Sequence, residues 1–239
     1  MFLNPYYQVS AQGIRISPQQ ASRFAKEVAG DFNPIHTPGA KRFCVPGDLL
    51  FSLVLNRYGL SQRMCFTFSG MVGEEALLSF PASDDRRFAI TDDRDRVCME
   101  VERDGAQCLD PVLIEAFARQ YVAFSGQNFP HVLLPLLQSE GVMINPDRPL
   151  VIYESMSIQL DRLNFALPVL EHAEHKVKIK GKRADVRLAF DILAEGRSVG
   201  AGFKKLVVSG LKPYDEQIAN QVVEDYLLSK MTYQQAVGD

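Results

Sequence analysis

The 239-residue chain has no block of basic residues, and its 26 Lys and Arg are outnumbered by 29 Asp and Glu, which gives a formal net charge of −3. Proteins that bind nucleic acid usually carry a clustered basic surface, so the composition argues against such a partner. The chain also lacks a long apolar run, because segments such as VLLPLL fall far below the roughly 18 residues of a membrane span. The stretch MFLNPYYQVS has no charged segment followed by an apolar one, so we expect no signal peptide.

Cysteine is scarce, and no two cysteines form a Cys-x-x-Cys pair. This spacing favours buried thiols in a reducing compartment over a disulfide framework or a zinc site. Apolar residues make up 46% of the chain, which is enough for a substantial core. We therefore expect a cytoplasmic protein of one large or two small domains. The cysteines are Cys44, Cys65, Cys98 and Cys108.

The first clear element is a helix that begins after Ser17, where a serine, a proline and a glutamine follow the pattern of a helix start. It is expected to end at Gly30. A second helix is expected from Gly47 to Gly59, and its residues are apolar on nearly every side, which indicates burial all round. Short strand-like segments separated by turn residues follow it. They are residues 63–70, 75–80, 87–92 and 96–105.

The same order of elements then repeats. Residues 111–126 have helical apolar spacing, residues 128–141 read as a short helix with a kink at Pro135, and four strand-like segments follow. The order indicates an internal duplication. The strand-like segments are 149–160, 174–182, 184–196 and 198–210. The tail is expected to be an amphipathic helix docked through Tyr214, Ile218, Val222 and Tyr226.

The segment between the first two helices is Asp31-Phe-Asn-Pro-Ile-His36. Its plain interpretation is a helix end followed by an Asx turn and a partly buried histidine. The longer string F-A-x-x-x-A-G-D-F-N-P-I-H, however, closely resembles the signature of the MaoC-like (R)-specific enoyl-thioester hydratases and dehydratases. The resemblance covers roughly residues 17–59. The chain's length also resembles that of an uncharacterised bacterial family within or near that superfamily.

The resemblance implies an α+β double hotdog, in which two central helices are each wrapped by an antiparallel sheet. The expected units are residues 1–110 with the motif, residues 111–212 as a second and non-catalytic hotdog, and residues 213–239 as a carboxyl-terminal helix and tail. The second unit keeps His131 but has no acid at the equivalent place. Two hotdogs in one chain allow a monomer, and a homodimer stays open.

The resemblance also implies roles for single residues. Asp31 and His36 are the expected catalytic pair, and Asn33 shapes the turn between them. Gly47 is expected to offer its N–H to the thioester carbonyl, where a helix amino terminus has free donors. Asp48, at the same helix start, is either a first-turn acid that the helix dipole stabilises or the carboxylate of a hotdog thioesterase.

Two departures from the family pattern concern substrate access. The link from the motif to the second helix, residues 37–46, is shorter than in the family, and Pro46 replaces the histidine that precedes the glycine. The expected activity is hydration of trans-2-enoyl or dehydration of (R)-3-hydroxyacyl groups on CoA or acyl carrier protein, without metal or redox cofactor. The alternatives are a non-catalytic acyl-binding or regulatory protein and a thioesterase that uses Asp48.

Three other features receive plain interpretations. Residues 91–96 (TDDRDR) form an expected solvated hairpin turn rather than an acidic ligand site. His172 and His175 have metal-like spacing but no evident third ligand. Cys44 and Cys65 are expected to be packing residues, because no basic partner is evident.

Overall fold

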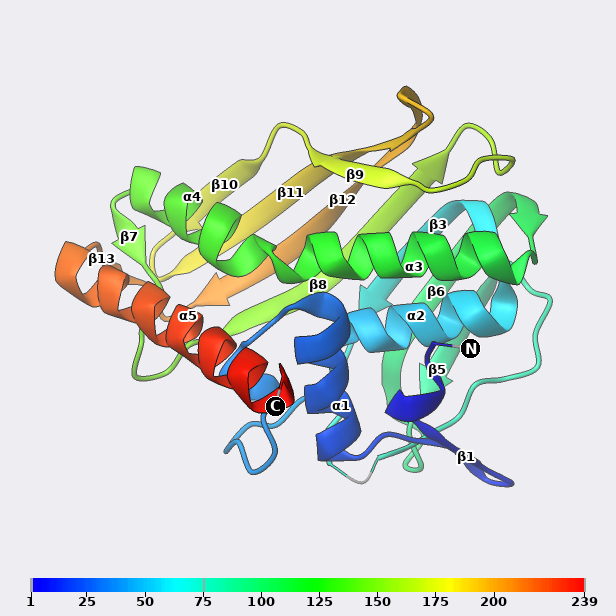
Figure 1. Ribbon diagram of the computed structural model, residues 1–239, viewed down its shortest axis with the longest axis horizontal. Helices are drawn as coiled ribbons and strands as arrows, with labels where there is room; N and C mark the ends of the chain where they lie inside the picture. The colour runs from blue at the N-terminus through cyan, green and yellow to red at the C-terminus, as the bar shows by residue number, and fades with distance from the viewer. Residues whose placement is uncertain (1, 75, 239) are drawn as a thin grey trace.

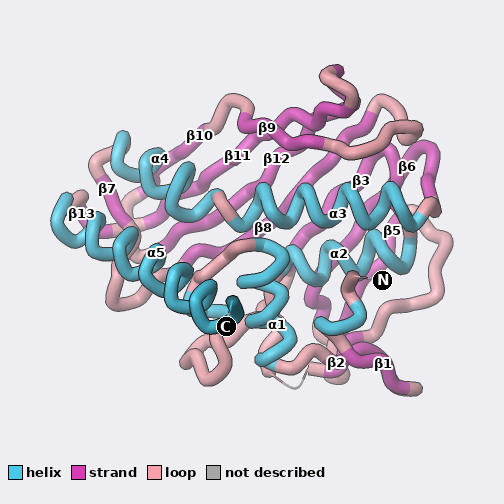
Figure 2. The backbone as a smooth tube through the Cα atoms, viewed as in Figure 1, coloured by secondary structure: helices cyan, strands magenta, loops and turns pink. Residues whose placement is uncertain are grey.

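The computed structural model describes residues 2–74 and 76–238. It is a mixed α+β structure with one large antiparallel sheet and long helices along one face of that sheet (Figure 1). The tube in Figure 2 shows the same two layers, with strands behind and helices in front. The helices are α1 (Pro18–Phe24), α2 (Gly47–Tyr58), α3 (Pro111–Gly126), α4 (Leu134–Ser139) and α5 (Glu216–Gly238), with short helical turns η1 (Asn4–Tyr6), η2 (Ala25–Ala29), η3 (Pro34–His36) and η4 (Phe129–Leu133).

The large sheet has eight strands in the order β10-β11-β12-β8-β3-β6-β5, and β9 pairs with the same edge of β11 as β10 does. Its centre is the antiparallel pairing of β3 with β8, which joins strands from the first and second halves of the chain. The strands are β3 (Leu60–Phe68), β5 (Arg87–Thr91), β6 (Val97–Cys108), β8 (Val151–Leu160), β9 (Val169–His172), β10 (Lys176–Lys180), β11 (Arg183–Ala194) and β12 (Arg197–Ser209).

Two small sheets accompany the large one. The first has the order β1-β2-β4 and the second pairs β13 with β7. The expected strand 75–80 therefore belongs mainly to a small sheet, although Ser79 bridges to Thr91 of β5. Glu75 lies outside the described residues. The strands are β1 (Gln8–Ser10), β2 (Gly13–Arg15), β4 (Leu77–Leu78), β7 (Val142–Met143) and β13 (Lys212–Pro213).

The prediction that the helix from Gly47 is buried all round is confirmed. Nine of the twelve residues of α2 are buried, including Leu49, Phe51 and Leu53. Phe51 packs at an angle against Tyr121 of α3, with ring centroids 4.7 Å apart. One continuous core runs from the amino-terminal segment through α2 and α3 to β11 and β12. The two halves thus share a core, and the cavity described below lies where they meet.

The tail helix docks differently from the expectation. Tyr226 is buried, but Tyr214 precedes α5 and Ile218 is 41% exposed. A second tyrosine, Tyr233, supplies contacts that the expected stripe did not include, since its hydroxyl donates to Glu27 Oε1 over 3.0 Å. In Figure 1, α5 lies beside α1 and the motif segment. The tail helix is therefore part of the site's surroundings.

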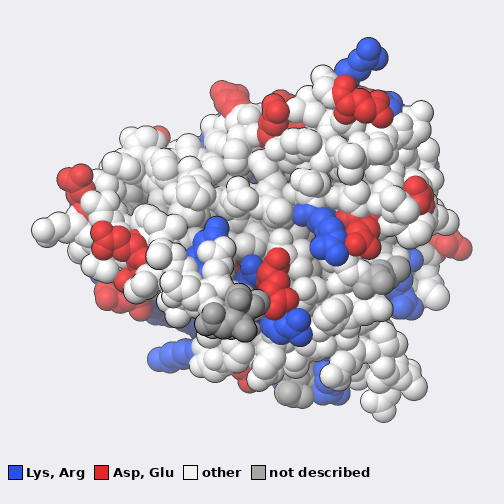
Figure 3. Space-filling view, in the orientation of Figure 1, with Lys and Arg blue, Asp and Glu red and all other residues white. Residues whose placement is uncertain are grey.

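Acidic and basic side chains are interspersed on the face shown in Figure 3. No helix among the described residues is long and apolar enough to cross a membrane. The hairpin turn expected at residues 91–96 is present, and Asp92 accepts hydrogen bonds from the backbone N–H groups of Arg94 and Arg96. The guanidinium of Arg96 also donates to Asp92 and helps hold its pKa below the ordinary value. These contacts account for the acidic run as turn structure.

Candidate functional site

The first helix ends where the sequence pattern predicts, and its end presents Asp31. Ser17 and Gln20 form both hydrogen bonds of a capping box at the start of α1. The helix continues as η2 and stops at Gly30, which has a φ of 65° in the left-handed region. Glycine adopts this conformation without the steric cost that a Cβ brings. Asp31 is therefore the first residue past the helix end.

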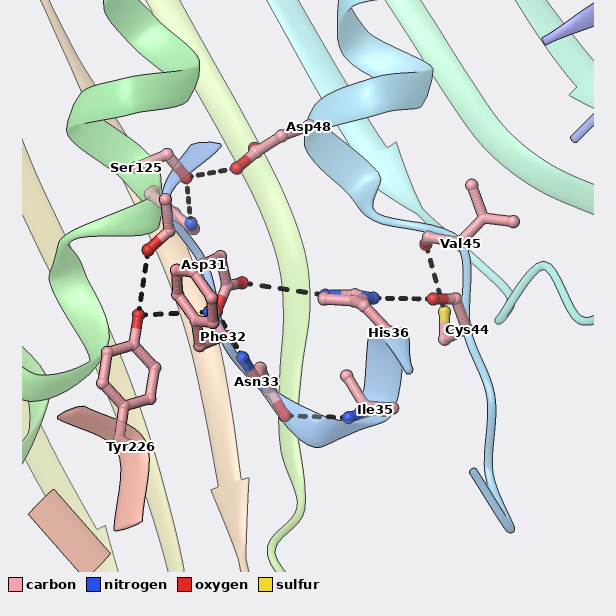
Figure 4. A network of polar contacts seen from close by, with 12 residues as sticks. Asp31, Phe32, Asn33, Ile35, His36, Cys44, Val45, Asp48, Ser125 and Tyr226 are labelled. Carbon is pink, nitrogen blue, oxygen red and sulfur yellow. Dashed lines mark hydrogen bonds and ion pairs between the residues drawn. The ribbon is translucent and has the colours of Figure 1, made fainter. Parts of the chain in front are cut away.

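The segment from Asp31 to His36 is a pair of consecutive side-chain turns. Asp31 Oδ1 accepts from the N–H of Asn33 at 2.9 Å, and Asn33 Oδ1 accepts from the N–H of Ile35 at 3.2 Å. Pro34 then begins the single turn η3, which ends at His36. The plain interpretation as an Asx turn is therefore correct as local structure. The same turns hold the acid and the imidazole on one side of the loop (Figure 4).

His36 is oriented by the link that follows it. Its Nδ1 lies 2.6 Å from the carbonyl oxygen of Cys44. A carbonyl oxygen can only accept, so Nδ1 carries the proton and Nε2 of the neutral ring has a free lone pair. Nε2 faces Asp31 Oδ2 at 3.7 Å, beyond a direct hydrogen bond. The side chains of Asp31 and His36 are 24% and 14% exposed, so the pair is half-buried at a cavity wall.

Tyr226 of α5 forms hydrogen bonds to the backbone on both sides of Asp31. Sequence reasoning missed this role. Its hydroxyl donates to the carbonyl of Gly30 at 3.1 Å and accepts from the N–H of Phe32 at 3.3 Å. Burial, with a further contribution from the charge of Asp31, raises the pKa of Tyr226 to about 12. The hydroxyl is therefore protonated at neutral pH and can make both bonds. The sequence signal was only that Tyr226 lies on the docking side of the helix.

Gly47 begins α2 at the wall of the same cavity. The preceding residue, Pro46, makes no side-chain cap, and no described residue accepts from the N–H of Gly47. A Cβ at this position would lie 3.0 Å from Phe68 Cε1 and 3.1 Å from Tyr153 Cδ1. Glycine thus lets the two aromatic rings approach the helix start and leaves its amide donor free.

Asp48 is the most buried acid of the site. Its Oδ2 accepts from Ser125 Oγ at 2.6 Å, and Lys204 Nζ donates to the same Ser125 Oγ at 2.5 Å. Its Oδ1 is buried and has no hydrogen-bond partner among the described residues. Burial raises the pKa of Asp48, and this effect outweighs the lowering by Lys204 and by the Ser125 hydrogen bond. Asp31 and His36 also act electrostatically on Asp48, so the polar groups form one cluster.

Ser125 and Lys204 were not singled out from the sequence, although signals existed. Ser125 lies on the buried stripe of α3 that includes Tyr121 and Val122. Lys204 is a lysine on β12 at a position that shares the inward face with Leu206 and Val208. A charged residue at an inward strand position needs a partner or a function, because its burial is otherwise costly.

A cavity of about 340 Å³ joins these groups. All five residues that the sequence predicts for the site contribute to its wall. The rest of the wall is mostly apolar, with contributions from Leu133, Ile152 and Leu206 of the second half. A small set of polar groups in an apolar cavity is typical of a small-molecule site. The five predicted residues are Asp31, Asn33, His36, Gly47 and Asp48.

The remaining sequence candidates lie elsewhere or are packing groups. The rings of His172 and His175 are 5.1 Å apart, and no group of three or more possible metal ligands is found in residues 2–74 and 76–238. Cys44 also borders the cavity, but burial raises the pKa of its thiol to about 11. At neutral pH this thiol is therefore protonated and a poor nucleophile. Burial likewise raises the pKa of Cys65.

Comparison with protein families matches residues 1–217 to the family described as Protein of unknown function (DUF3581). The chain belongs to this family. The match ends at the start of α5, so the helix that carries Tyr226 lies beyond it. No curated protein matches the chain.

Solved structures similar to this chain include an acyl-CoA thioesterase II from Mycobacterium marinum, at 10% identity and a TM-score of 0.40, covering 90% of this chain and 100% of that chain. Another is a MaoC-like dehydratase, at 10% identity and a TM-score of 0.43, covering 86% of this chain and 98% of that chain. The likeness is too distant to transfer an activity. The chemistry of the cavity therefore rests on its own residues.

Proposed function

We propose that the protein is a double-hotdog acyl-thioester hydratase or dehydratase, which acts on trans-2-enoyl or (R)-3-hydroxyacyl groups carried on CoA or acyl carrier protein. One observation supports this above all. Asp31 Oδ2 and His36 Nε2 face each other at 3.7 Å. Both residues line the same cavity as Gly47, the first residue of α2. A carboxylate and an imidazole that can hold one water, with a free amide donor at the same cavity, suit the addition of water to an enoyl thioester.

In the proposed reaction, one water molecule binds between Asp31 and His36. The separation of 3.7 Å is too long for a direct hydrogen bond and leaves both atoms able to hold the same water. The hydrogen bond from Nδ1 to Cys44 keeps the lone pair of Nε2 directed at this water. His36 accepts the proton of the water as its oxygen bonds to C3 of the enoyl group.

The thioester carbonyl gains negative charge as the enolate forms, and the N–H of Gly47 is the proposed donor to its oxygen. Helix amino termini favour negative charge through free N–H groups and the helix dipole. In other enzymes, removal of one such donor costs about 3–4 kcal/mol of transition-state stabilisation. Asn33 is assigned to shaping the turn that holds the catalytic pair, consistent with its hydrogen bonds.

The proposed architecture follows from the same assignment. Residues 1–110 form the catalytic hotdog around α2, residues 111–212 form a second hotdog around α3, and residues 213–239 form the docked tail. The contact of β3 with β8 joins the two proposed units into one sheet. A monomer with paired hotdogs, located in the cytoplasm, is the proposed form, with a homodimer as the other possibility.

Thioester hydrolysis is a second candidate, and the environment of Asp48 favours it. Asp48 lies next to Gly47, and its Oδ1 has no partner among the described residues. A buried carboxylate with a raised pKa beside a bound thioester can serve as a base for water. A third candidate is an acyl-binding protein without turnover, favoured by the short link of residues 37–46 and by Pro46.

One assay separates these candidates. Purified protein is mixed with short- and long-chain enoyl-CoA, while absorbance of the enoyl band and release of free thiol are followed together. A hydratase removes the enoyl band without thiol release, and Asp31→Asn lowers that rate about 100-fold or more, as loss of a catalytic acid or base does. Thiol release that disappears in Asp48→Asn identifies a thioesterase instead. Binding of acyl-CoA with neither signal contradicts both enzymatic proposals.

A further inference from the structure

A buried hydrogen-bonded chain connects three elements at the cavity. Lys204 on β12 donates to Ser125 on α3 at 2.5 Å, and Ser125 donates to Asp48 on α2 at 2.6 Å. All three residues are at most 9% exposed, and all three contribute to the cavity wall. Figure 4 places Ser125 and Asp48 beside the Asp31–His36 pair but on different elements. The chain is therefore a second polar group in the same cavity.

The lysine of this chain is bound in an unusual way for a buried ammonium. Within residues 2–74 and 76–238, no carboxylate oxygen lies within 4.0 Å of its Nζ. Its partners there are the hydroxyl of Ser125 and the ring of Tyr153, whose centroid is 4.2 Å away. An ammonium has three N–H donors, and one hydrogen bond leaves two of them for a ligand. Lys204 thus offers N–H donors at the cavity wall.

At the other end of the chain, Asp48 is suited to exchange a proton. One of its oxygens is bonded to Ser125 and the other is buried without a partner among the described residues. Burial raises the pKa of Asp48, so this carboxyl takes up a proton more readily than an exposed one. A serine hydroxyl between the two groups accepts from one and donates to the other, so a proton can pass between Asp48 and Lys204 without solvent.

We propose that Lys204, Ser125 and Asp48 form a proton-transfer chain that exchanges the proton at the α-carbon of the bound acyl thioester. The inference rests on the proposed function and assigns its two proton transfers to different residues. Asp31 and His36 act on the water at C3, while Lys204 acts as the acid or base at C2. Lys204 is a catalytic residue in this scheme, and Ser125 and Asp48 supply its proton.

The step balances within the protein. Water gives a proton to His36, its oxygen bonds to C3, and the electron pair of the C2–C3 double bond moves to C2. That pair takes a proton from Lys204 Nζ, so a C–H bond forms and an N–H bond breaks. Neutral Lys204 regains a proton from Ser125, which takes one from protonated Asp48. The cycle closes when His36 releases its proton and Asp48 takes one up, and dehydration follows the same steps in reverse.

The test uses exchange at C2, which does not require hydration. Nitrophenylacetyl-CoA has acidified C2 protons and no double bond or leaving group at C3, so it reports only on the α-carbon. The full-length protein is incubated with it in D₂O, and deuterium uptake is followed by mass spectrometry. Lys204→Met and Ser125→Ala are the test variants. Lys205→Met is the matched control, because Lys205 is the next residue on β12 and is exposed.

The expected result is C2 exchange by wild type and Lys205→Met, with a loss of about 100-fold in Lys204→Met, in the range of general acid–base catalysis. Ser125→Ala keeps the lysine but breaks the chain, so we expect it to slow exchange by about 10-fold or more. Thermal melts establish that each variant is folded. If Lys204→Met does not fold, the test rests on Ser125→Ala. Exchange at the wild-type rate in Ser125→Ala then overturns the proposal.

Other outcomes separate the inference from the proposed function. Exchange that depends on Lys204 in a protein that does not hydrate enoyl-CoA supports the chain and overturns the hydratase assignment. Hydration with no C2 exchange, or exchange that is lost in Asp31→Asn and kept in Lys204→Met, overturns the chain and leaves the hydratase assignment in place. Absence of both reactions contradicts both.

Discussion

The two halves of the chain each place a histidine after a helix, His36 and His131, but fold the segment before it differently. In the first half, Gly30 adopts a left-handed conformation, the helix stops, and His36 turns into the cavity. In the second half, Gln127 keeps helical angles and the chain continues through η4 into α4. His131 consequently lies on the exposed side of a helix. The first helix thus ends before His36, whereas His131 lies within η4.

The glycines of the two halves also have different tasks. Gly126 lies at the end of α3, and a Cβ there would be 1.9 Å from the carbonyl oxygen of Ala29. A Cβ added at Gly30 would meet no atom within 4 Å, so the requirement there is the positive φ alone. Gly126 thus allows the backbones of the two halves to approach closely, whereas Gly30 allows the left-handed backbone conformation that ends the first helix.

The largest difference between the halves is expected in activity. His36→Gln removes the base of the proposed pair and should lower enoyl-CoA hydration by about 10²–10⁴-fold, the usual range for a general base. His131→Gln changes an exposed histidine in the second half and should leave the rate unchanged. The measurement is the initial rate of loss of the enoyl band for both variants. Equal effects of the two substitutions would contradict the assignment of a single catalytic half.

A smaller effect, on stability, separates the glycines. Gly126→Ala forces a backbone clash and should destabilise the protein by about 3 kcal/mol or more, at the upper end of overpacking substitutions. Gly30→Ala places a Cβ in the left-handed region and should cost about 1–2 kcal/mol. Urea unfolding of both variants measures the difference. If Gly30→Ala proves the more damaging change, close packing at Gly126 is not what joins the halves.

The smallest expected effect concerns Tyr226, which contacts both halves. Its ring lies 6.1 Å from Phe32 and 5.3 Å from Phe129, but its hydroxyl bonds only to the first half. Tyr226→Phe keeps the ring and removes the two hydrogen bonds around Asp31. We expect roughly a 10-fold fall in kcat with little change in KM, because misplacement of a catalytic group slows chemistry more than binding.

The control for that variant is Tyr233→Phe, which removes a hydroxyl of the same helix that bonds to Glu27 instead of the motif. It should leave kcat within about two-fold of wild type, because it does not touch the groups that place Asp31. A similar loss in both variants would mean that α5 acts through general docking and that the hydroxyl of Tyr226 has no special part in placing Asp31.

Local patterns predicted local structure well. The capping box at Ser17, the helix end at Gly30, the start of α2 at Gly47 and the helix at residues 111–126 all lie where the sequence indicates. Each depends on hydrogen bonds or backbone angles among residues close in sequence.

Contacts between distant segments were harder to predict. Lys204, Ser125 and Asp48 lie on three elements, and their hydrogen bonds span 77 and 79 residues of sequence. Tyr226 reaches Gly30 across 196 residues. Nothing in the local pattern of a strand or helix specifies such partners, because they follow from how sheets and helices pack.

The sequence by itself determined where the helices begin and end, which helix is buried, and the local turns that hold Asp31 next to His36, since these follow from capping, periodicity and Asx-turn chemistry. Tertiary structure decided that Asp48, Ser125 and Lys204 share the cavity and that Tyr226 holds the motif. The physical reason is that buried polar groups must find hydrogen-bond partners across elements, and only the packed arrangement of the two halves brings those partners within reach.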